Sequence, residues 1–132
     1  MSPRIELQAN HEAARQIGPW LVEALAELKA PQAARTGELE LALHELAINI
    51  VDHAYDETTR PTASYTIELS IEDSELLACF CDRGQPFVDD RPAGDGEPTV
   101  GGYGLIIVEQ LAASVRYERA GDQNRWTLVF SP

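Results

Sequence analysis

The sequence predicts an α/β (α+β) two-layer sandwich, in which a mixed, mainly antiparallel sheet carries about three helices on one face. Three observations support this fold class. Runs that alternate apolar and polar residues, as half-buried strands do, occur near the start, in the middle and at the end of the chain. Runs with helical periodicity separate them. Turn-forming residues join the later strands into two hairpins, and 132 residues correspond to one domain, residues 1–132.

The N-terminal part of the chain is predicted to form one strand and one interrupted helix. Residues 4–8 alternate apolar and polar side chains, which indicates the strand. Asn10 is a suitable cap for the helix that follows. Gly18 and Pro19 interrupt that helix, because proline inside a helix kinks it or makes it restart. The helical pattern then resumes and ends before Pro31.

The longest predicted helix contains residues 41–55, and Thr36 is a suitable cap that precedes its first core residue, Leu39. Successive residues turn by about 100°, so its core stripe comprises Leu39, Leu43, Leu46, Ile50 and Ala54. The same geometry places a seam of four polar side chains on one face: Glu45, Asn49, Asp52 and His53. Leu41 and Ile48 flank this polar seam, and the predicted solvated face comprises Glu40, His44 and Ala47.

Apolar neighbours on both sides make the polar seam narrower than an ordinary solvated face. Because buried polar groups need partners, we predict that Glu45 and Asn49 face a cavity or a ligand. The alternative is that these side chains simply face solvent.

A hairpin and a long loop are predicted after the central helix. Residues 63–71 and 75–81 form the two strands, joined by the turn-forming residues 72–74. Residues 85–100 contain three prolines and show no periodicity. Loops of this length in small domains are often lids or binding segments, so we predict that role here.

The C-terminal part returns to regular structure. Residues 101–113 have helical periodicity, and residues 115–119 and 125–130 form a final hairpin around Gly121 and Asp122. The predicted sheet therefore receives its last two strands from the end of the chain.

The charge balance limits the possible partners. Ten basic and twenty-two acidic residues give a net charge of −12. Direct binding of nucleic acid is not expected, because phosphate contacts require a basic surface, and anionic membranes are disfavoured for the same reason. No apolar run is long enough to span a membrane and no leader segment opens the sequence, so a cytoplasmic location is predicted. Cys79 and Cys81 lie two apart on one strand and are predicted to be reduced core thiols.

Three separate segments carry residues suited to chemistry. The first is the polar seam, the second is the run from Cys81 to Gly84, and the third is the glycine-rich run 101–105. Asp82 ends a strand, which acidic residues also do without any function, and the glycine run could be an ordinary loop. Together, however, they supply an amide, carboxylates and a helix amino terminus that suits phosphate. This set is suited to a nucleotide with magnesium.

The three segments resemble the motifs of the GHKL ATPase/kinase superfamily, which has the Bergerat ATP-binding fold. The matching patterns are Glu45-x-x-x-Asn49-x-x-x-His53-Ala54-Tyr55, Asp82-x-Gly84-x-Pro86-Phe87 and Gly101-Gly102-x-Gly104-Leu105. In this order and spacing they are most similar to the anti-sigma-factor serine/threonine kinases. The resemblance covers nearly the whole chain and implies that residues 85–100 are the ATP lid.

The resemblance also implies roles for individual residues. Asn49 would bind magnesium, and Glu45 would be the general base that activates the attacking hydroxyl. Asp82 would accept the adenine amino group, and Gly84 would let the purine pack closely. His53 would form a hydrogen bond beside the phosphate pocket. Gly102 and Gly104 would hold the phosphates at the helix start, and Thr127 would reach the adenine end of the nucleotide. The other implied ATP-binding residues are Pro86, Gly101, Tyr103 and Leu105.

Arg91 is the only basic residue in the predicted lid, and Arg83 lies just before the lid. Its charge would stabilise the γ-phosphate during transfer, and the alternative is an ordinary solvated loop arginine.

The function implied is that of an ATP-dependent protein serine/threonine kinase with magnesium as cofactor. It would phosphorylate an anti-sigma antagonist protein of the STAS-like class and sequester a sigma factor, and the resemblance implies a homodimer. The rival interpretation is a non-catalytic, nucleotide-responsive module that acts by partner exchange. A third interpretation is an ATPase without a protein substrate.

Overall fold

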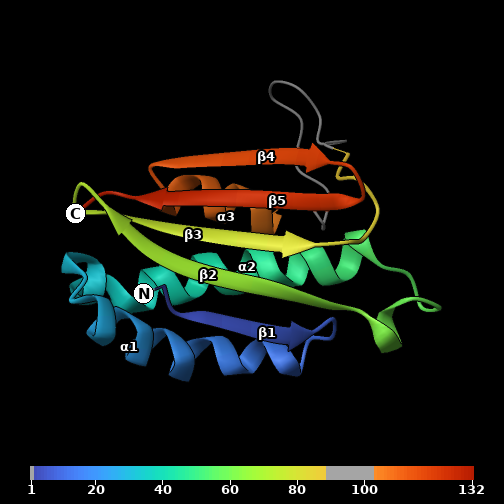
Figure 1. Ribbon diagram of the computed structural model, residues 1–132, viewed down its shortest axis with the longest axis horizontal. Coiled ribbons are helices and arrows are strands. Elements are labelled where there is room, and N and C mark those ends of the chain that lie inside the picture. The colour runs from blue at the N-terminus through green and yellow to red at the C-terminus, as the bar shows by residue number, and fades with distance from the viewer. Residues whose placement is uncertain (1, 89–102) are drawn as a thin grey trace.

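Five strands form one sheet, and the helices lie behind it in the computed structural model, which describes residues 2–88 and 103–132 (Figure 1). The strands are β1 (Arg4–Gln8), β2 (Ser64–Glu72), β3 (Glu75–Asp82), β4 (Ser114–Ala120) and β5 (Gln123–Phe130), and their order across the sheet is β1-β2-β3-β5-β4. All four pairings are antiparallel. The predicted two-layer sandwich is therefore confirmed, although the described strands include no parallel pair that would make the sheet mixed.

Three α-helices cover the inner face of the sheet in the described part of the chain: α1 (Ile17–Leu28), α2 (Thr36–Ala54) and α3 (Tyr103–Leu111). Short 3-10 turns precede or follow them at η1 (Ala13–Gln16), η2 (Pro31–Arg35) and η3 (Arg60–Thr62). Figure 1 shows α2 behind the middle of the sheet, with α1 near β1 and α3 behind β5. The helix used for the polar seam is thus the central one.

The helix starts differ from the predicted ones in two places. The change from 3-10 turn to α-helix occurs at Ile17, so Pro19 lies in the first turn of α1, where its missing N–H costs no hydrogen bond. Thr36 is the first residue of α2 rather than its cap, because its hydroxyl donates to the Ala33 carbonyl of the preceding 3-10 turn. Asn10 does act as a cap, since its Oδ1 accepts the Ala13 N–H.

The core lies between the sheet and the helices. Alternation along β3 turns Leu76, Ala78, Phe80 and Asp82 inward. On α2 the buried surface is wider than predicted: Ala47 is fully buried instead of solvated, while Leu41 is 44% exposed instead of flanking a buried seam. The reason is that α1 and α3 pack against α2 from both sides. A single helix cannot reveal that it has neighbours on two flanks as well as a sheet below.

The outer face of the sheet carries the two cysteines. Cys79 and Cys81 are free thiols with their Sγ atoms 3.9 Å apart, as their spacing on one strand predicts. They are half-exposed rather than core residues, because the helices cover only the inner face. Partial burial and the neighbouring thiol of Cys81 raise the pKa of Cys79 to about 11.

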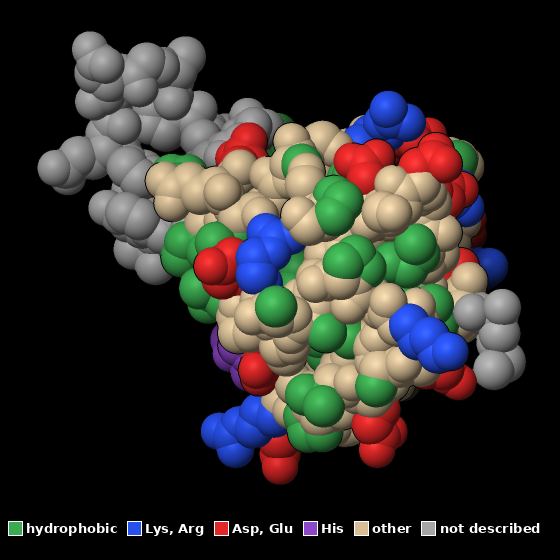
Figure 2. Space-filling model, turned by 90° about the vertical axis from the view of Figure 1, so that its left-hand side faces the viewer, with side chains coloured by type: hydrophobic (Ala, Val, Ile, Leu, Met, Phe, Trp, Pro, Cys, Tyr) green, Lys and Arg blue, Asp and Glu red, His purple; other side chains and the backbone are tan. Residues whose placement is uncertain are grey.

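Charged side chains of both signs are interspersed over the end of the molecule that holds the β2–β3 turn (Figure 2). The net charge of −12 therefore does not form a surface of one sign at this end. Among the described helices, none combines the length and the apolar character needed to cross a membrane.

Candidate functional site

A pocket forms where the C-terminal half of α2 faces the ends of β3 and β5. It is lined by Asn49, Ile50, His53, Ala54, Asp82, Gln85, Phe87, Asn124 and Trp126. Two of the motifs found in the sequence, the polar seam and the Asp82 run, therefore meet here. The open volume is only about 10 Å³, which is room for about one water molecule.

Asp82 is the buried acid of this pocket, and its side chain is only 3% exposed. Its Oδ1 accepts two hydrogen bonds of 2.8 Å, from the Gly84 N–H and from Asn124 Nδ2. Its Oδ2 is also buried but has no hydrogen-bond partner among the described residues. Burial raises the pKa of Asp82 above its ordinary value of 3.8, although the hydrogen bonds from Asn124 and Gly84 and the charge of Arg119 oppose this shift. The free oxygen is thus an acceptor that a donor group of a ligand could satisfy.

Asn124 is the residue of this site that the sequence analysis missed. It lies opposite Asp82 in the β3–β5 register and is 2% exposed. Its Nδ2 donates to Asp82 Oδ1 and, at 2.8 Å, to the Gln85 carbonyl. Its Oδ1 accepts the Tyr117 hydroxyl at 2.5 Å and Arg119 Nη1 at 3.0 Å. The alternation of β5, which turns residues 124, 126, 128 and 130 inward, was the available signal.

Thr127 lies on the opposite face of the sheet from Asn124. It pairs with Cys79 on the outer face of the sheet, and its side chain interacts with that thiol. It does not line the pocket, so its predicted contact with the adenine end of a nucleotide conflicts with the alternation of β5. On the inner face at this end of β5, the residue next to Asp82 is Asn124 instead.

Phe87 closes one side of the pocket. Its ring packs edge-on against Trp126, with centroids 4.9 Å apart, and against Tyr117 at 5.5 Å. Its backbone N–H donates to the Tyr117 hydroxyl at 2.9 Å. Gln85 and Phe87, at the start of the predicted lid, are therefore held against β4 and β5. Pro86 and Val88 are exposed, and residues 89–100, including Arg91, lie outside the described part of the chain.

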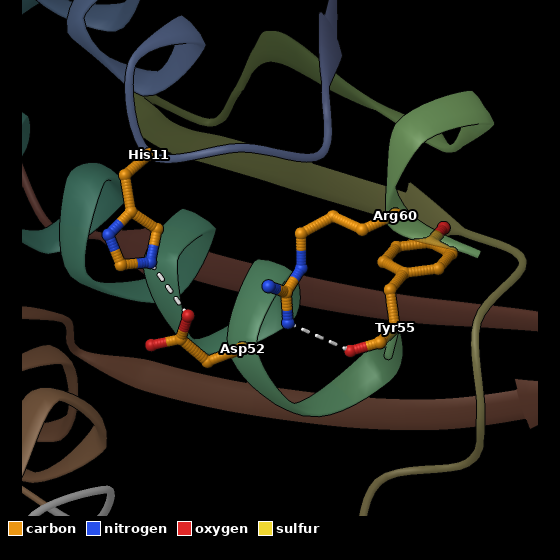
Figure 3. Close-up of polar contacts among 4 residues, drawn as sticks. All are labelled: His11, Asp52, Tyr55 and Arg60. Atoms are coloured by element: carbon orange, nitrogen blue, oxygen red, sulfur yellow. Dashed lines mark hydrogen bonds and ion pairs between the residues drawn. The ribbon is translucent and has the colours of Figure 1, made fainter. Parts of the chain in front are cut away.

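The polar seam of α2 separates into different environments. Asn49 lines the pocket and is 8% exposed, and its amide has no hydrogen-bond partner among the described residues. His53 also lines the pocket but is exposed. Asp52 points away and accepts a 2.7 Å hydrogen bond from His11, as Figure 3 shows. The prediction of a polar seam directed at a cavity is thus confirmed for Asn49, whereas Asp52 is an exposed link between α2 and the segment before η1.

The C-terminal end of α2 is held by two further contacts. Arg60 Nη2 donates to the Tyr55 carbonyl at 3.2 Å (Figure 3). The Gln85 N–H donates to the Ala54 carbonyl at 2.8 Å, and a Cβ added at Gly84 would lie 2.4 Å from that carbonyl oxygen. The missing side chain of Gly84 therefore lets the strand end approach α2. Its predicted role beside a purine stays a prediction.

Glu45 lies one turn before Asn49 on α2 and contacts the start of α3. A Cβ added at Gly104 would lie 2.8 Å from Glu45 Oε2, so the glycine lets this carboxylate lie directly against the start of α3. Glu45 also faces an open hollow of about 590 Å³ between α2 and the segment around η1, lined by His11, Glu12, Arg15, His44, Glu45 and Ile48.

The third motif is described only in part. Gly104 and the buried Leu105 belong to α3, and the backbone of Tyr103 begins it. Gly101 and Gly102 lie outside the described residues. What is described brings the start of α3 to the middle of α2, so all three motifs converge on one helix.

The comparisons with known proteins agree with this geometry. The family described as histidine kinase-like ATPase domain matches residues 7–130, nearly the whole chain. The chain belongs to this family of ATPase domains. The GHKL resemblance of its motifs is thereby confirmed. Comparison with curated protein sequences finds no significant match.

Two solved structures share the fold. One contains the RsbU and RsbW domains of Rv1364c from Mycobacterium tuberculosis, with a TM-score of 0.68 and 23% identity over 99% of this chain. The other is the histidine kinase domain of the blue-light activated histidine kinase EL346 from Erythrobacter litoralis, with a TM-score of 0.57 and 17% identity over 86% of this chain. The matches span 32% and 60% of those two chains. These similarities establish the shared fold.

The residues present fit the ATP that the family implies. The unpartnered Asp82 Oδ2 is an acceptor for an exocyclic amino group, and the aromatic side chains of Phe87 and Trp126 border the same pocket. Carboxylate and amide oxygens are the ligands that magnesium prefers, and Asn49 and Glu45 supply one of each along α2. Because the open volume is small, a purine enters only if side chains that line the pocket move.

Proposed function

We propose that this protein is an ATP-dependent, regulatory protein serine/threonine kinase. It would transfer the γ-phosphate to a serine or threonine of an anti-sigma antagonist protein and would bind a sigma factor in competition with that antagonist. The observation that carries the proposal is the line of polar groups along one pocket and one helix, from Asp82 Oδ2 through Asn49 to Glu45. The similarity of the three motifs to those of anti-sigma-factor kinases supports the choice of substrate.

Each residue along this line has one task. Asp82 accepts the amino group of adenine and so selects the base. Asn49 would hold a magnesium ion, which would neutralise charge at the phosphates. Glu45 accepts the proton of the attacking hydroxyl, because its carboxylate is next to the start of α3, where the helix dipole favours phosphate.

The hollow beside Glu45 supports a protein substrate. Its open side lies between α2 and the segment around η1, so an acceptor segment can reach the carboxylate without passing through the pocket that holds Asp82. Phosphoryl transfer depends mainly on positioning and charge neutralisation, so one base and one metal ligand suffice on the protein side. Residues 85–100 are the proposed ATP lid, and Arg91 its phosphate-directed cation.

The kinase is tested by incubation with magnesium, radiolabelled ATP and a STAS-like antagonist protein. We expect labelled phosphoserine or phosphothreonine on the antagonist. Glu45→Gln should retain ATP affinity and lower the transfer rate by at least about a hundredfold, the ordinary contribution of a general base. Glu40→Gln is the matched control, because Glu40 is an exposed residue on the same helix. Intact ATP binding without transfer by the wild-type protein would exclude the kinase.

The magnesium assignment is tested separately. Asn49→Ala should abolish the magnesium-dependent part of ATP affinity, measured by calorimetry with magnesium and with EDTA. An unchanged magnesium dependence would show that Asn49 is not the metal ligand.

A second candidate is a non-catalytic switch that binds nucleotide and exchanges partners. The small open volume favours it, because nucleotide entry requires residues that line the pocket, among them Phe87, to change conformation. In that case Glu45→Gln would leave both nucleotide affinity and partner exchange unchanged.

The homodimer that the resemblance implies is tested by light scattering with and without ATP.

A further inference from the structure

A directed chain of hydrogen bonds joins the backbone at Phe87 to the carboxylate of Asp82. The Phe87 N–H can only donate, so the Tyr117 oxygen accepts it at 2.9 Å. The Tyr117 hydroxyl proton is then free for Asn124 Oδ1, at 2.5 Å. This leaves Asn124 Nδ2 to donate to Asp82 Oδ1 at 2.8 Å. Every donor and acceptor along the chain is therefore determined by the one before it.

The amide of Asn124 has no capacity left for a ligand. Its two N–H groups donate to Asp82 Oδ1 and the Gln85 carbonyl, and its oxygen accepts from Tyr117 and Arg119. An amide offers two donors and two acceptor lone pairs, and all four are used. Asn124 thus acts on the pocket through Asp82 and the chain segment that follows it.

The same network holds the segment after β3 in place. Arg119 Nη1 donates to the Gly84 carbonyl at 2.7 Å, and Asn124 Nδ2 donates to the Gln85 carbonyl. Phe87 is held through its N–H by Tyr117 and through its ring by Tyr117 and Trp126. Side chains from β4 and β5 therefore position three successive points of residues 84–87, the start of the proposed lid.

We propose that Tyr117 and Asn124 are positioning residues that couple the base-reading carboxylate of Asp82 to residues 84–87 at the start of the lid. The coupling rests on the proposed function, in which Asp82 accepts the amino group of adenine. Since Asn124 and Gly84 occupy Oδ1, Oδ2 alone is directed to the ligand. A base that enters the pocket displaces Phe87. The series of hydrogen bonds from Phe87 through Tyr117 and Asn124 transmits this displacement to the orientation of Asp82.

Tyr117→Phe is the variant that interrupts the series of hydrogen bonds, because it removes the hydroxyl and keeps the ring against Phe87 and Trp126. Tyr65→Phe is the matched control, since the buried Tyr65 hydroxyl has no hydrogen-bond partner in the described residues. Thermal unfolding of both variants establishes that they are folded. Two readouts follow, one without nucleotide and one with it.

The first readout is hydrogen exchange of the Phe87 amide without nucleotide, followed by NMR. We expect exchange about tenfold faster in Tyr117→Phe, the effect of losing one hydrogen bond of ordinary net strength, and less than about twofold faster in Tyr65→Phe. Equal exchange rates in the two variants would show that the Tyr117 hydroxyl does not hold the Phe87 N–H, and would overturn the proposed coupling.

The second readout is the ratio of the dissociation constants for ITP and ATP, because inosine carries a carbonyl where adenine carries its amino group. We expect a preference for ATP in the wild-type protein and in Tyr65→Phe, and a ratio at least about threefold smaller in Tyr117→Phe. An equal loss of affinity for both nucleotides would show a merely structural role and overturn the coupling, while the proposed function would stand. If the wild-type protein binds neither nucleotide, both the coupling and the proposed function are overturned.

Discussion

The two ends of the sheet use buried polar side chains for different purposes. At the end with the β2–β3 turn, Gln32 is fully buried and its Nε2 donates to the carbonyls of Ser74 and Phe130, which ties η2 to the sheet. At the other end, Asp82, Asn49 and Asn124 are buried around the pocket. Three of the four buried polar side chains in the described residues thus gather at one end.

The difference lies in what each end leaves unpaired. Gln32 Oε1 and Asp82 Oδ2 are both buried without a hydrogen-bond partner among the described residues. Gln32 is neutral, and its Nε2 donates to two backbone carbonyls. These two hydrogen bonds offset the free-energy cost of burying its unpaired Oε1. Asp82 is a carboxyl group that lines a pocket, so a hydrogen-bond donor in that pocket would offset the cost of its burial. The unsatisfied carboxylate at a pocket is therefore a candidate binding group, whereas buried polarity alone is not.

The largest effect is expected from Gly84→Ala at the pocket end. The added Cβ would lie 2.4 Å from the Ala54 carbonyl oxygen and 2.5 Å from its Cβ, and backbone cannot give way cheaply. We expect a loss of about 3 kcal/mol in the free energy of unfolding, measured with urea. Gly37→Ala is the control in α2, because nothing lies within 4 Å of its added Cβ, and it should be neutral or stabilising by up to about 1 kcal/mol. Equal effects at the two positions would contradict this packing.

The second effect concerns the opposite end. Gln32→Ala removes both donors and leaves the carbonyls of Ser74 and Phe130 unpaired, so we expect a loss of about 2 kcal/mol in urea unfolding. ATP affinity should change less than about twofold, because the substitution is at the end without the pocket. Gln8→Ala, at an exposed position of β1, is the control and should change stability by less than about 0.5 kcal/mol. A large loss of ATP affinity in Gln32→Ala would mean that the two ends are coupled.

Asp82→Asn should have a smaller effect, of opposite sign. Burial raises the pKa of Asp82, so between the ordinary pKa and the raised pKa the folded state holds more protons than the unfolded state. The free energy of unfolding therefore falls as pH rises from the ordinary pKa to the raised pKa. Above the raised pKa the full cost of burying the charged carboxylate is present. We expect Asp82→Asn to stabilise the protein by about 1 kcal/mol at pH 7 and to lose this gain below pH 3.8.

Two measurements check the Asp82 prediction. Urea unfolding at several pH values should show the gain shrinking as pH falls, and nucleotide titration at pH 7 should show the loss of the preference for ATP over ITP. A variant that is less stable than the wild type at pH 7 would mean that the carboxylate is not the strained group of this pocket. Glu68→Gln, on an exposed position of the neighbouring β2, serves as the control.

The smallest effect is expected at the surface of α2. His11→Ala removes the hydrogen bond to Asp52, but both side chains are largely exposed to solvent. Exposed pairs contribute little, so we expect a loss of less than about 0.5 kcal/mol and weaker dependence on salt. Asp52→Asn should have the same effect within error, and a loss above about 1 kcal/mol for either variant would give this contact a structural role that its exposure does not predict.

Local patterns were sufficient for most of the fold. Alternation and, for residues 75–81, a short apolar run between turn residues predicted all five strands within two residues at each end. Turn-forming residues predicted the two hairpin turns at residues 72–74 and around Gly121 and Asp122, and positive backbone φ angles occur there at Asp73, Ser74 and Gly121. The starts of α1 and α2 were less accurate, since 3-10 turns lead directly into both helices.

Motifs of fixed spacing were sufficient to predict that a carboxylate, an amide and a glycine-rich helix start contribute to one site, because such spacing is recognised without knowledge of packing. Asp82, Asn49 and Glu45 were found in this way. Which side chains meet depends on the tertiary structure. The burial of Ala47, the outward position of Thr127 and the contacts of Asn124 with Asp82, Tyr117 and the segment leading to Phe87 all depend on neighbours distant in the chain. Such contacts follow from strand register and from helices packed on both flanks of α2, which no local pattern specifies.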